Sequence, residues 1–211
     1  MSPFFSIIIP AYNSESYIRK GLDSIRSQSF RDYELLVICD RCTDNTEQIA
    51  KGYGAITECV NYGRDGLTRD YGIRMATGQY VLFMDDDDWF LHEFCFQQLH
   101  DKLIELGDDV DALAFGSVFK GKGYVMLKAD EVFKSTVGHV WSVCWKRESI
   151  KYARFGDAVF CSDTYFLKSI EMNVHRLELW DMPIYYYNFK REGSQTDKLI
   201  KGMIRQSPIA R

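Results

Sequence analysis

The chain has 211 residues, of which 46% are hydrophobic, so it is long enough for one compact domain with its own core and short for two. Its formal net charge of −4 argues against a nucleic-acid partner, because a nucleic-acid-binding surface needs an excess of Lys and Arg. No apolar run approaches the roughly 20 residues that span a bilayer. The run Phe4 to Ile9 is too short for a signal peptide, so we expect a cytoplasmic protein.

Strand and helix patterns alternate along the first part of the chain. The β-branched run Phe4 to Ile9 predicts a strand. A helix with apolar residues on one face is predicted to follow from Asn13 or Ser14. Similar patterns then predict strands at 34–38, 55–60 and 80–84 and helices at 46–53 and 65–76. This alternation predicts an α/β fold with a mostly parallel sheet flanked by helices.

The second part of the chain is less regular. Helices are predicted at 91–106 and 163–171, and strands at 111–119, 124–127, 174–179 and 183–187. The tail 198–211 mixes basic and apolar residues, which leaves three interpretations: a peripheral membrane contact, a frayed helix, or a contact within a homo-oligomer. The sequence contains no linker-like segment, so we predict a single domain.

Four consecutive carboxylates, Asp85 to Asp88, directly follow the apolar run Tyr80 to Met84. An apolar run without alternation is typical of a strand covered on both faces, and sheets of such strands bind ligands at their carboxyl ends. Adjacent carboxylates raise one another's pKa unless a cation neutralises them, and their oxygens suit Mg²⁺ or Mn²⁺ bound to phosphates. The cluster therefore predicts a metal–diphosphate site. The alternative is that Asp88 caps the next helix and the others are solvated turn residues.

Two common nucleotide-binding loops are missing from the sequence. The first strand leads into Pro10-Ala11-Tyr12-Asn13 instead of a G-x-G-x-x-G loop, and no P-loop pattern occurs. A nicotinamide-dependent dehydrogenase and a P-loop enzyme are therefore disfavoured. The second strand runs into Asp40, where a carboxylate can accept a hydrogen bond from a ring N–H or a ribose hydroxyl.

Cys39 and Cys42 form an isolated C-x-x-C. This spacing occurs in redox sites and in half of a zinc site. No second pair accompanies it, and Cys39 ends an apolar run, so we interpret both as plain thiols.

Five segments follow one another in a fixed order. They are S-I-I-I-P-A-Y-N at 6–13, L-D-S-I-R-S-Q-S-F at 22–30, C-D-R-C-T-D-N-T at 39–46, A-T-G-Q-Y at 76–80 after Arg69, and D-D-D at 85–87. In this order and spacing they resemble the motifs of the family 2 glycosyltransferases, which have the GT-A fold. The last segment is similar to the family's metal-binding D-x-D. The sequence departs from the family pattern at Cys39, Arg41 and Cys42, usually Asp, Gly and Ser, and at Asp70, commonly Asn.

The resemblance implies an inverting transfer of a sugar from a nucleotide-sugar donor, of the UDP type, to a hydroxyl acceptor. It implies a divalent metal cofactor, Mn²⁺ or Mg²⁺, and a saccharide or lipid-linked saccharide acceptor used in bacterial surface polysaccharide biosynthesis at the inner face of the plasma membrane. It also divides the single domain 1–211 into a nucleotide-binding half at 1–90, an acceptor-binding half at 91–197 and the basic tail at 198–211.

Individual roles follow from the same resemblance. The residues implied in nucleotide binding are Pro10, Ala11, Tyr12, Asn13, Asp40, Arg69, Asp85 and Asp86. Within this set, Asp40 would accept a hydrogen bond from the base and Asp86 would bind the ribose. Asp87 would coordinate the metal.

The resemblance also implies a general base and an acceptor site. The segment that ends at Asp163 is similar to the family's E-D pair, with Ser162 in place of the glutamate. Asp163 would take the proton of the acceptor hydroxyl; Asp157 is the competitor, and a helix N-cap is the structural alternative for Asp163. Trp141 and Trp145 would either stack on a sugar or fill the core. Arg191 would reach the diphosphate when a mobile loop closes.

Two other functions are weighed against this one. A non-catalytic relative that only binds nucleotide sugar is supported by Cys39, Arg41 and Ser162. A sugar nucleotidyltransferase is disfavoured, because it would need a glycine-rich basic loop where Pro10 to Asn13 stands.

Overall fold

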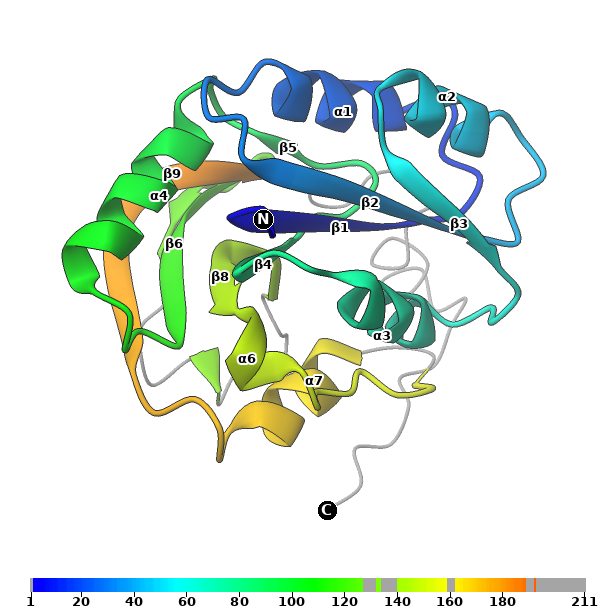
Figure 1. The fold of residues 1–211 in the computed structure, drawn as a ribbon. Coiled ribbons are helices and arrows are strands. Elements are labelled where there is room, and N and C mark those ends of the chain that lie inside the picture. The colour runs from blue at the N-terminus through cyan, green and yellow to red at the C-terminus, as the bar shows by residue number, and fades with distance from the viewer. Residues whose placement is uncertain (1, 127–131, 134–139, 159–161, 189–191, 193–211) are drawn as a thin grey trace.

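The structure is a computed structural model that describes residues 2–126, 132–133, 140–158, 162–188 and 192. A single mixed sheet runs through it, with helices on both faces (Figure 1). The first elements along the chain are β1 (Phe5–Ala11), α1 (Ile18–Arg26), β2 (Tyr33–Asp40), α2 (Thr46–Gly52), β3 (Ile56–Val60), α3 (Asp65–Met75) and β4 (Tyr80–Phe83). They are followed by β5 (Trp89–Phe90), α4 (Cys95–Leu106), β6 (Ala112–Phe119), β7 (Gly123–Val125), η1 (Val140–Ser142), β8 (Val143–Lys146), α6 (Arg147–Ile150), α7 (Ser162–Ile170) and β9 (Leu177–Tyr187).

The parallel half of the sheet confirms the alternation predicted from the sequence. Strands β3, β2, β1 and β4 lie side by side in this order, and all three pairs are parallel. All residues of β1 and β4 are buried, as a strand covered on both faces requires. Parallel strands that follow one another through helices bring their carboxyl ends to one edge.

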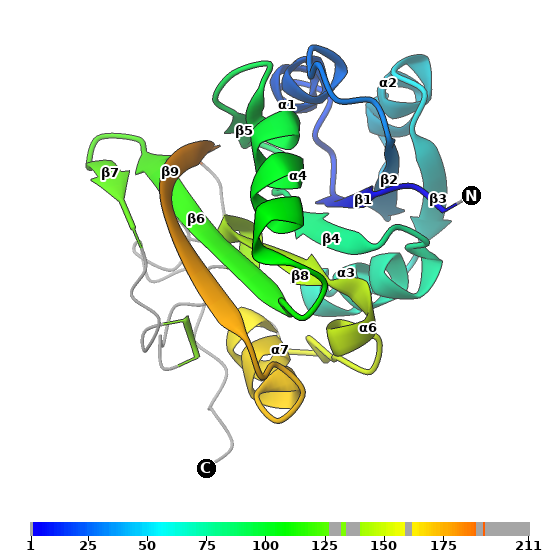
Figure 2. The ribbon, with the colours of Figure 1, turned by 60° about the vertical axis from the view of Figure 1, so that its left-hand side comes forward.

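The other half of the sheet is mixed. β8 pairs antiparallel with β4 and with β6, β9 lies parallel to β6, and β5 pairs antiparallel with β9. Figure 2 shows β9 running alongside β6, with β7 at the far end of β6. The two late strands predicted at 174–179 and 183–187 are in fact one strand, and that prediction was wrong. Its register against β6 shifts beside Gly116, opposite Pro183, because a proline has no N–H for the ladder and an irregularity accommodates it.

The core lies in two layers, one on each face of the sheet. Helices α1, α2 and α4 cover one face and α3, α6 and α7 cover the other (Figure 1). The apolar stripe of α1, Ile18, Leu22 and Ile25, is buried as its spacing predicts. The helix begins at Ile18, later than predicted, because the side chains of Asn13 and Ser14 bond to Thr43 and Asp86 instead of capping it.

Among the described residues, no helix is both long enough and apolar enough to cross a membrane. The tail 198–211 and Arg191 lie outside the described residues. The predicted tail interactions and the role of Arg191 stay predictions.

Candidate active site

The loops after β1, β2 and β4 meet at the carboxyl edge of the parallel half. Asp86 Oδ2 accepts hydrogen bonds from Ser14 Oγ and from the Tyr12 backbone N–H, the latter at 3.4 Å. Asn13 Oδ1 accepts from the Thr43 N–H at 2.8 Å. The structure therefore brings the ends of these three strands together at one edge of the sheet.

The four aspartates after β4 occupy two environments. Asp85, Asp86 and Asp87 are half-buried, whereas Asp88 is fully buried. Asp88 accepts hydrogen bonds from the Tyr185 hydroxyl at 2.7 Å and from the Asn188 N–H at 2.8 Å. Burial raises the pKa of Asp88 well above its usual range, and the charges of its two neighbouring carboxylates add to this effect.

Asp88 therefore joins the end of β4 to the end of β9. It does not cap α4, which begins at Cys95 without a side-chain cap, so that alternative is wrong. Tyr185 tightens the same link, because its hydroxyl oxygen also accepts the Asp85 N–H at 3.1 Å. The acidic loop, which we define as Asp85 to Asp88, is thus held in position by hydrogen bonds to the end of β9.

Arg69 lies at the centre of the site. It extends from α3 and is only 5% exposed. Its Nη2 donates to Asp85 Oδ1 at 2.5 Å, and its Nη1 donates to Asp65 and lies 3.9 Å from Asp163 Oδ1. A buried guanidinium thus joins the acidic loop to Asp163. The sequence resemblance had placed Arg69 near the base or the diphosphate; in this structure its described ion pairs are with carboxylates.

Asp163 sits in the first turn of α7, and its side chain is 17% exposed. Its pKa is raised to about 6, chiefly by burial; the charge of Arg69 opposes this rise and the charge of Asp85 adds to it. A carboxylate with a pKa near the working pH is suited to accept a proton. The competitor, Asp157, is exposed. The N-cap alternative does not fit, because α7 already begins at Ser162.

The α7 segment is held against α3 by close contacts that sequence reasoning missed. Asp70 accepts hydrogen bonds from the backbone N–H groups of Phe155, at 2.7 Å, and Gly156, at 3.2 Å. At Gly66, a Cβ atom would come within 2.4 Å of the Gly156 carbonyl oxygen and 3.0 Å of Ser162 Cβ. The signal available in the sequence was a glycine and an aspartate within a helix pattern, which does not by itself identify a packing partner.

Asp40 lies at the expected strand end but has a different set of partners from the one predicted. Its carboxylate is buried and accepts hydrogen bonds from the backbone N–H groups of Tyr62 and Gly63 at 2.9 Å and of Arg64 at 3.1 Å. The Thr68 hydroxyl donates to it at 3.2 Å. These bonds anchor the loop between β3 and α3, so Asp40 has a structural role, and its contact with a nucleobase stays a prediction.

The other predicted site residues lie around this edge with different exposures. Pro10 and Ala11 end β1 and are buried, whereas Tyr12 is 56% exposed. Trp145 is fully buried in β8 and donates its ring N–H to the Val140 carbonyl at 3.1 Å. Trp141 is buried as well, beneath the rings of β9. Burial supports the core alternative for both tryptophans.

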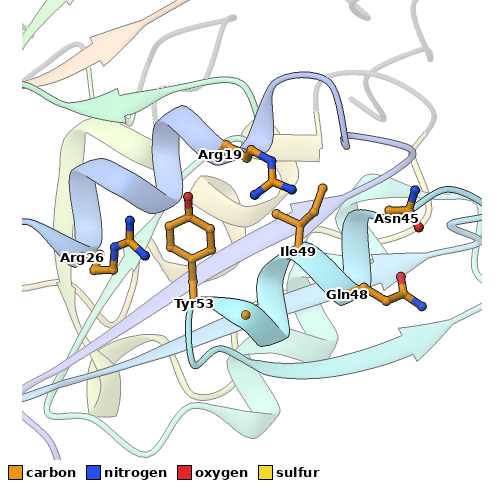
Figure 3. A pocket seen from close by; sticks show the side chains of 7 residues that line it. Arg19, Arg26, Asn45, Gln48, Ile49 and Tyr53 are labelled. Atoms are coloured by element: carbon orange, nitrogen blue, oxygen red, sulfur yellow. The ribbon is translucent and has the colours of Figure 1, made fainter.

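A separate cavity of about 450 Å³ lies between α1 and α2 (Figure 3). Its lining residues are Arg19, Arg26, Asn45, Gln48, Ile49, Gly52 and Tyr53. Neither the acidic loop nor Asp163 lines it, so the carboxylate cluster and this cavity are distinct features.

The family described as "Glycosyl transferase family 2" matches residues 6–173. Glycosyltransferase GlyA of Streptococcus pneumoniae is 24% identical over 88% of this chain and 30% of its own length. Poly(ribitol-phosphate) beta-N-acetylglucosaminyltransferase TarS of Staphylococcus aureus is 29% identical over 90% of this chain and 36% of its own length. The chain thus spans about a third of the length of these relatives.

Solved structures share the fold. The crystal structure of S. aureus TarS 1–349 in complex with UDP-GlcNAc superposes with a TM-score of 0.80 and 24% identity, covering 92% of this chain and 60% of that one. The mannosyltransferase PcManGT from Pyrobaculum calidifontis, in complex with GDP-Man and Mn²⁺, has a TM-score of 0.71 and 18% identity, covering 95% of this chain and 61% of that one.

Proposed function

The chain belongs to glycosyl transferase family 2 and has the GT-A fold, and from this premise we propose that it transfers a sugar, with inversion, from a nucleotide-sugar donor to a hydroxyl acceptor. The observation that carries the proposal is the Arg69 bridge between the acidic loop and Asp163. It sets a partly buried carboxylate of raised pKa, Asp163, beside the acidic loop, whose carboxylates would hold a diphosphate through a bound divalent cation. That arrangement is what an inverting displacement needs.

In this mechanism Asp163 acts on the acceptor. Its carboxylate takes the proton of the acceptor hydroxyl as that oxygen bonds to the anomeric carbon of the donor sugar. The bond from the anomeric carbon to the diphosphate oxygen breaks on the opposite face, and its electron pair leaves with the diphosphate. Arg69 holds Asp163 in place and keeps its pKa from rising further.

The divalent cation is proposed from the residue types of the acidic loop, because no three His, Cys, Asp or Glu side chains in the described part of the chain are already placed to share one ion. Asp85, Asp86 and Asp87 offer hard carboxylate oxygens from three consecutive positions. Asp87 would coordinate the ion. Asp86 accepts a hydrogen bond from Ser14, and the charge of Asp85 is neutralised by its ion pair with Arg69. When bound, Mn²⁺ or Mg²⁺ would stabilise the negative charge that develops on the departing diphosphate.

The donor and acceptor are proposed from the relatives. TarS is named as acting on poly(ribitol-phosphate) with N-acetylglucosamine, and its structure holds UDP-GlcNAc. We therefore propose a UDP-sugar donor and a saccharide or lipid-linked saccharide acceptor of surface polysaccharide biosynthesis, with the protein acting at the cytoplasmic face of the membrane.

The test is UDP release from a panel of UDP-sugars with Mn²⁺ and hydroxylated acceptors. Asp163→Asn removes the base and should lower turnover about 100-fold or more, with little change in the Kd for UDP. Asp157→Asn, a matched change at an exposed aspartate of the preceding loop, should retain turnover. Equal losses in both variants, or full activity in Asp163→Asn, would move the base elsewhere.

A further inference from the structure

Two non-glycine residues at the active edge have left-handed backbone. Asn13, after β1, has φ 48°, and Arg41, after β2, has φ 56°; among the described residues, other positive φ values belong to glycines. Asparagine tolerates this region, but for arginine the conformation costs about 1–2 kcal/mol. Such residues cluster at ligand sites, so the side chain of Arg41 calls for a functional explanation.

The surroundings of Arg41 fix where its guanidinium lies. Its backbone N–H donates to the Val60 carbonyl at 2.9 Å, and its Nε lies 3.7 Å from Asp40 Oδ1. The guanidinium rests directly on Gly63, where a Cβ atom would come within 2.5 Å of its Cζ. Its Cζ is 5.9 Å from the centre of the Tyr12 ring. Arg41 and Tyr12 therefore form one half-exposed corner of the site.

This corner presents hydrogen-bond donors, and several acceptors around it already receive hydrogen bonds. Asp40 receives four hydrogen bonds from the β3–α3 loop and α3. The Ala11 carbonyl accepts from Cys42 Sγ at 3.4 Å, and Asn13 Oδ1 accepts from the Thr43 N–H. The Arg41 side chain is 52% exposed. Within the described part of the chain, its Nη atoms donate to no protein acceptor.

We propose that Arg41 determines nucleobase specificity: with the base stacked on Tyr12, its guanidinium donates to a carbonyl oxygen of that base. The assignment rests on the proposed function, since it needs a nucleotide at this edge. Uracil, cytosine and guanine carry a carbonyl oxygen, and adenine carries none. A planar guanidinium suits such acceptors.

The test measures the Kd of UDP, CDP, GDP and ADP by calorimetry with Mn²⁺. Arg41→Gly keeps a residue suited to the left-handed backbone and should melt at the same or a higher temperature. It should weaken UDP about 10- to 100-fold, the range for a hydrogen bond to a charged group, and leave ADP unchanged. Arg74→Ala removes a matched arginine that lies 5.3 Å from the Tyr71 ring near the other end of α3, and should alter neither Kd.

Two results would overturn the assignment alone. In the first, Arg41→Gly binds UDP with the same Kd as the unchanged chain. In the second, the substitution weakens UDP and ADP by the same factor, which would mean that the guanidinium contacts the phosphates. If the unchanged chain bound none of the four nucleotides, the assignment and the proposed function would both fall.

Discussion

At the scale of single residues, the acid–base behaviour of the site depends on the charges that surround Asp163. Its carboxylate is largely buried, which raises its pKa to about 6, and the guanidinium of Arg69 limits the rise. A general base works only when deprotonated. Turnover at saturating donor should therefore increase as the pH rises through about 6, with a slope of about one proton, and level off above it.

Arg69→Gln tests the cause of that pKa. It removes the positive charge that favours the ionised carboxylate, so the acid limb of the pH–rate profile should move to higher pH. An acid limb that stays in place, or moves to lower pH, would show that Arg69 does not set the pKa of the base.

At the scale of elements, the position of α7 depends on how closely α3 approaches it. Gly66→Ala would drive a Cβ into the Gly156 carbonyl at 2.4 Å. Because that atom is backbone, the segment leading to Asp163 must shift, and we expect a destabilisation of about 1–3 kcal/mol together with slower turnover. Gly52→Ala is the matched control: this helical glycine has open space around its Cβ direction, so it should stabilise by about 0.5–1 kcal/mol. Urea unfolding measures both changes, and an equal response of the two variants would refute the packing argument.

The link between β4 and β9 gives a second test at this scale. Tyr185→Phe keeps the buried ring but removes the hydroxyl that donates to Asp88 and accepts the Asp85 N–H. Leaving these buried groups short of a partner should cost about 1–3 kcal/mol. Tyr186→Phe is the control on the neighbouring residue, whose ring stacks on Trp89 at 4.0 Å and whose hydroxyl has no hydrogen-bond partner among the described residues. In chemical denaturation, Tyr185→Phe should unfold at a lower denaturant concentration than Tyr186→Phe. Similar midpoints would mean that the Tyr185 hydroxyl does not contribute to stability.

At the scale of the whole molecule, the sequence predicted the fold best in the parallel half, where long apolar strands alternate with helices of clear periodicity. Buried apolar strands followed by helices predicted β1 to β4 as strands of a parallel sheet, in which Asp40 and the acidic loop share the carboxyl edge. The prediction failed in the mixed half. β5 has two residues and β8 four, too few to show a period. β9 reads as two strands because Pro183 interrupts its pattern.

The sequence predicted where the site lies in the sheet but not the contacts of its side chains. The position of a carboxylate at a strand end follows from the sheet, but its partners depend on tertiary contacts. Asp40 faces the β3–α3 loop, Asp88 faces Tyr185, and Asp70 faces Phe155, each across a long sequence separation. No local pattern records these contacts. The role of Asp163 as general base stays a prediction, and its geometric support is the 3.9 Å approach of Arg69 Nη1 to its carboxylate.

The acidic edge of the sheet is proposed as the donor site, and the dependence of UDP affinity on Mn²⁺ and on Asp87 measures whether UDP binds there. Calorimetry should show that Mn²⁺ tightens UDP binding by at least about tenfold and that Asp87→Ala abolishes this gain while the variant stays folded. If UDP bound equally well with Mn²⁺, with a chelator and to Asp87→Ala, the nucleotide diphosphate would not be held at this edge, and the donor site would lie elsewhere.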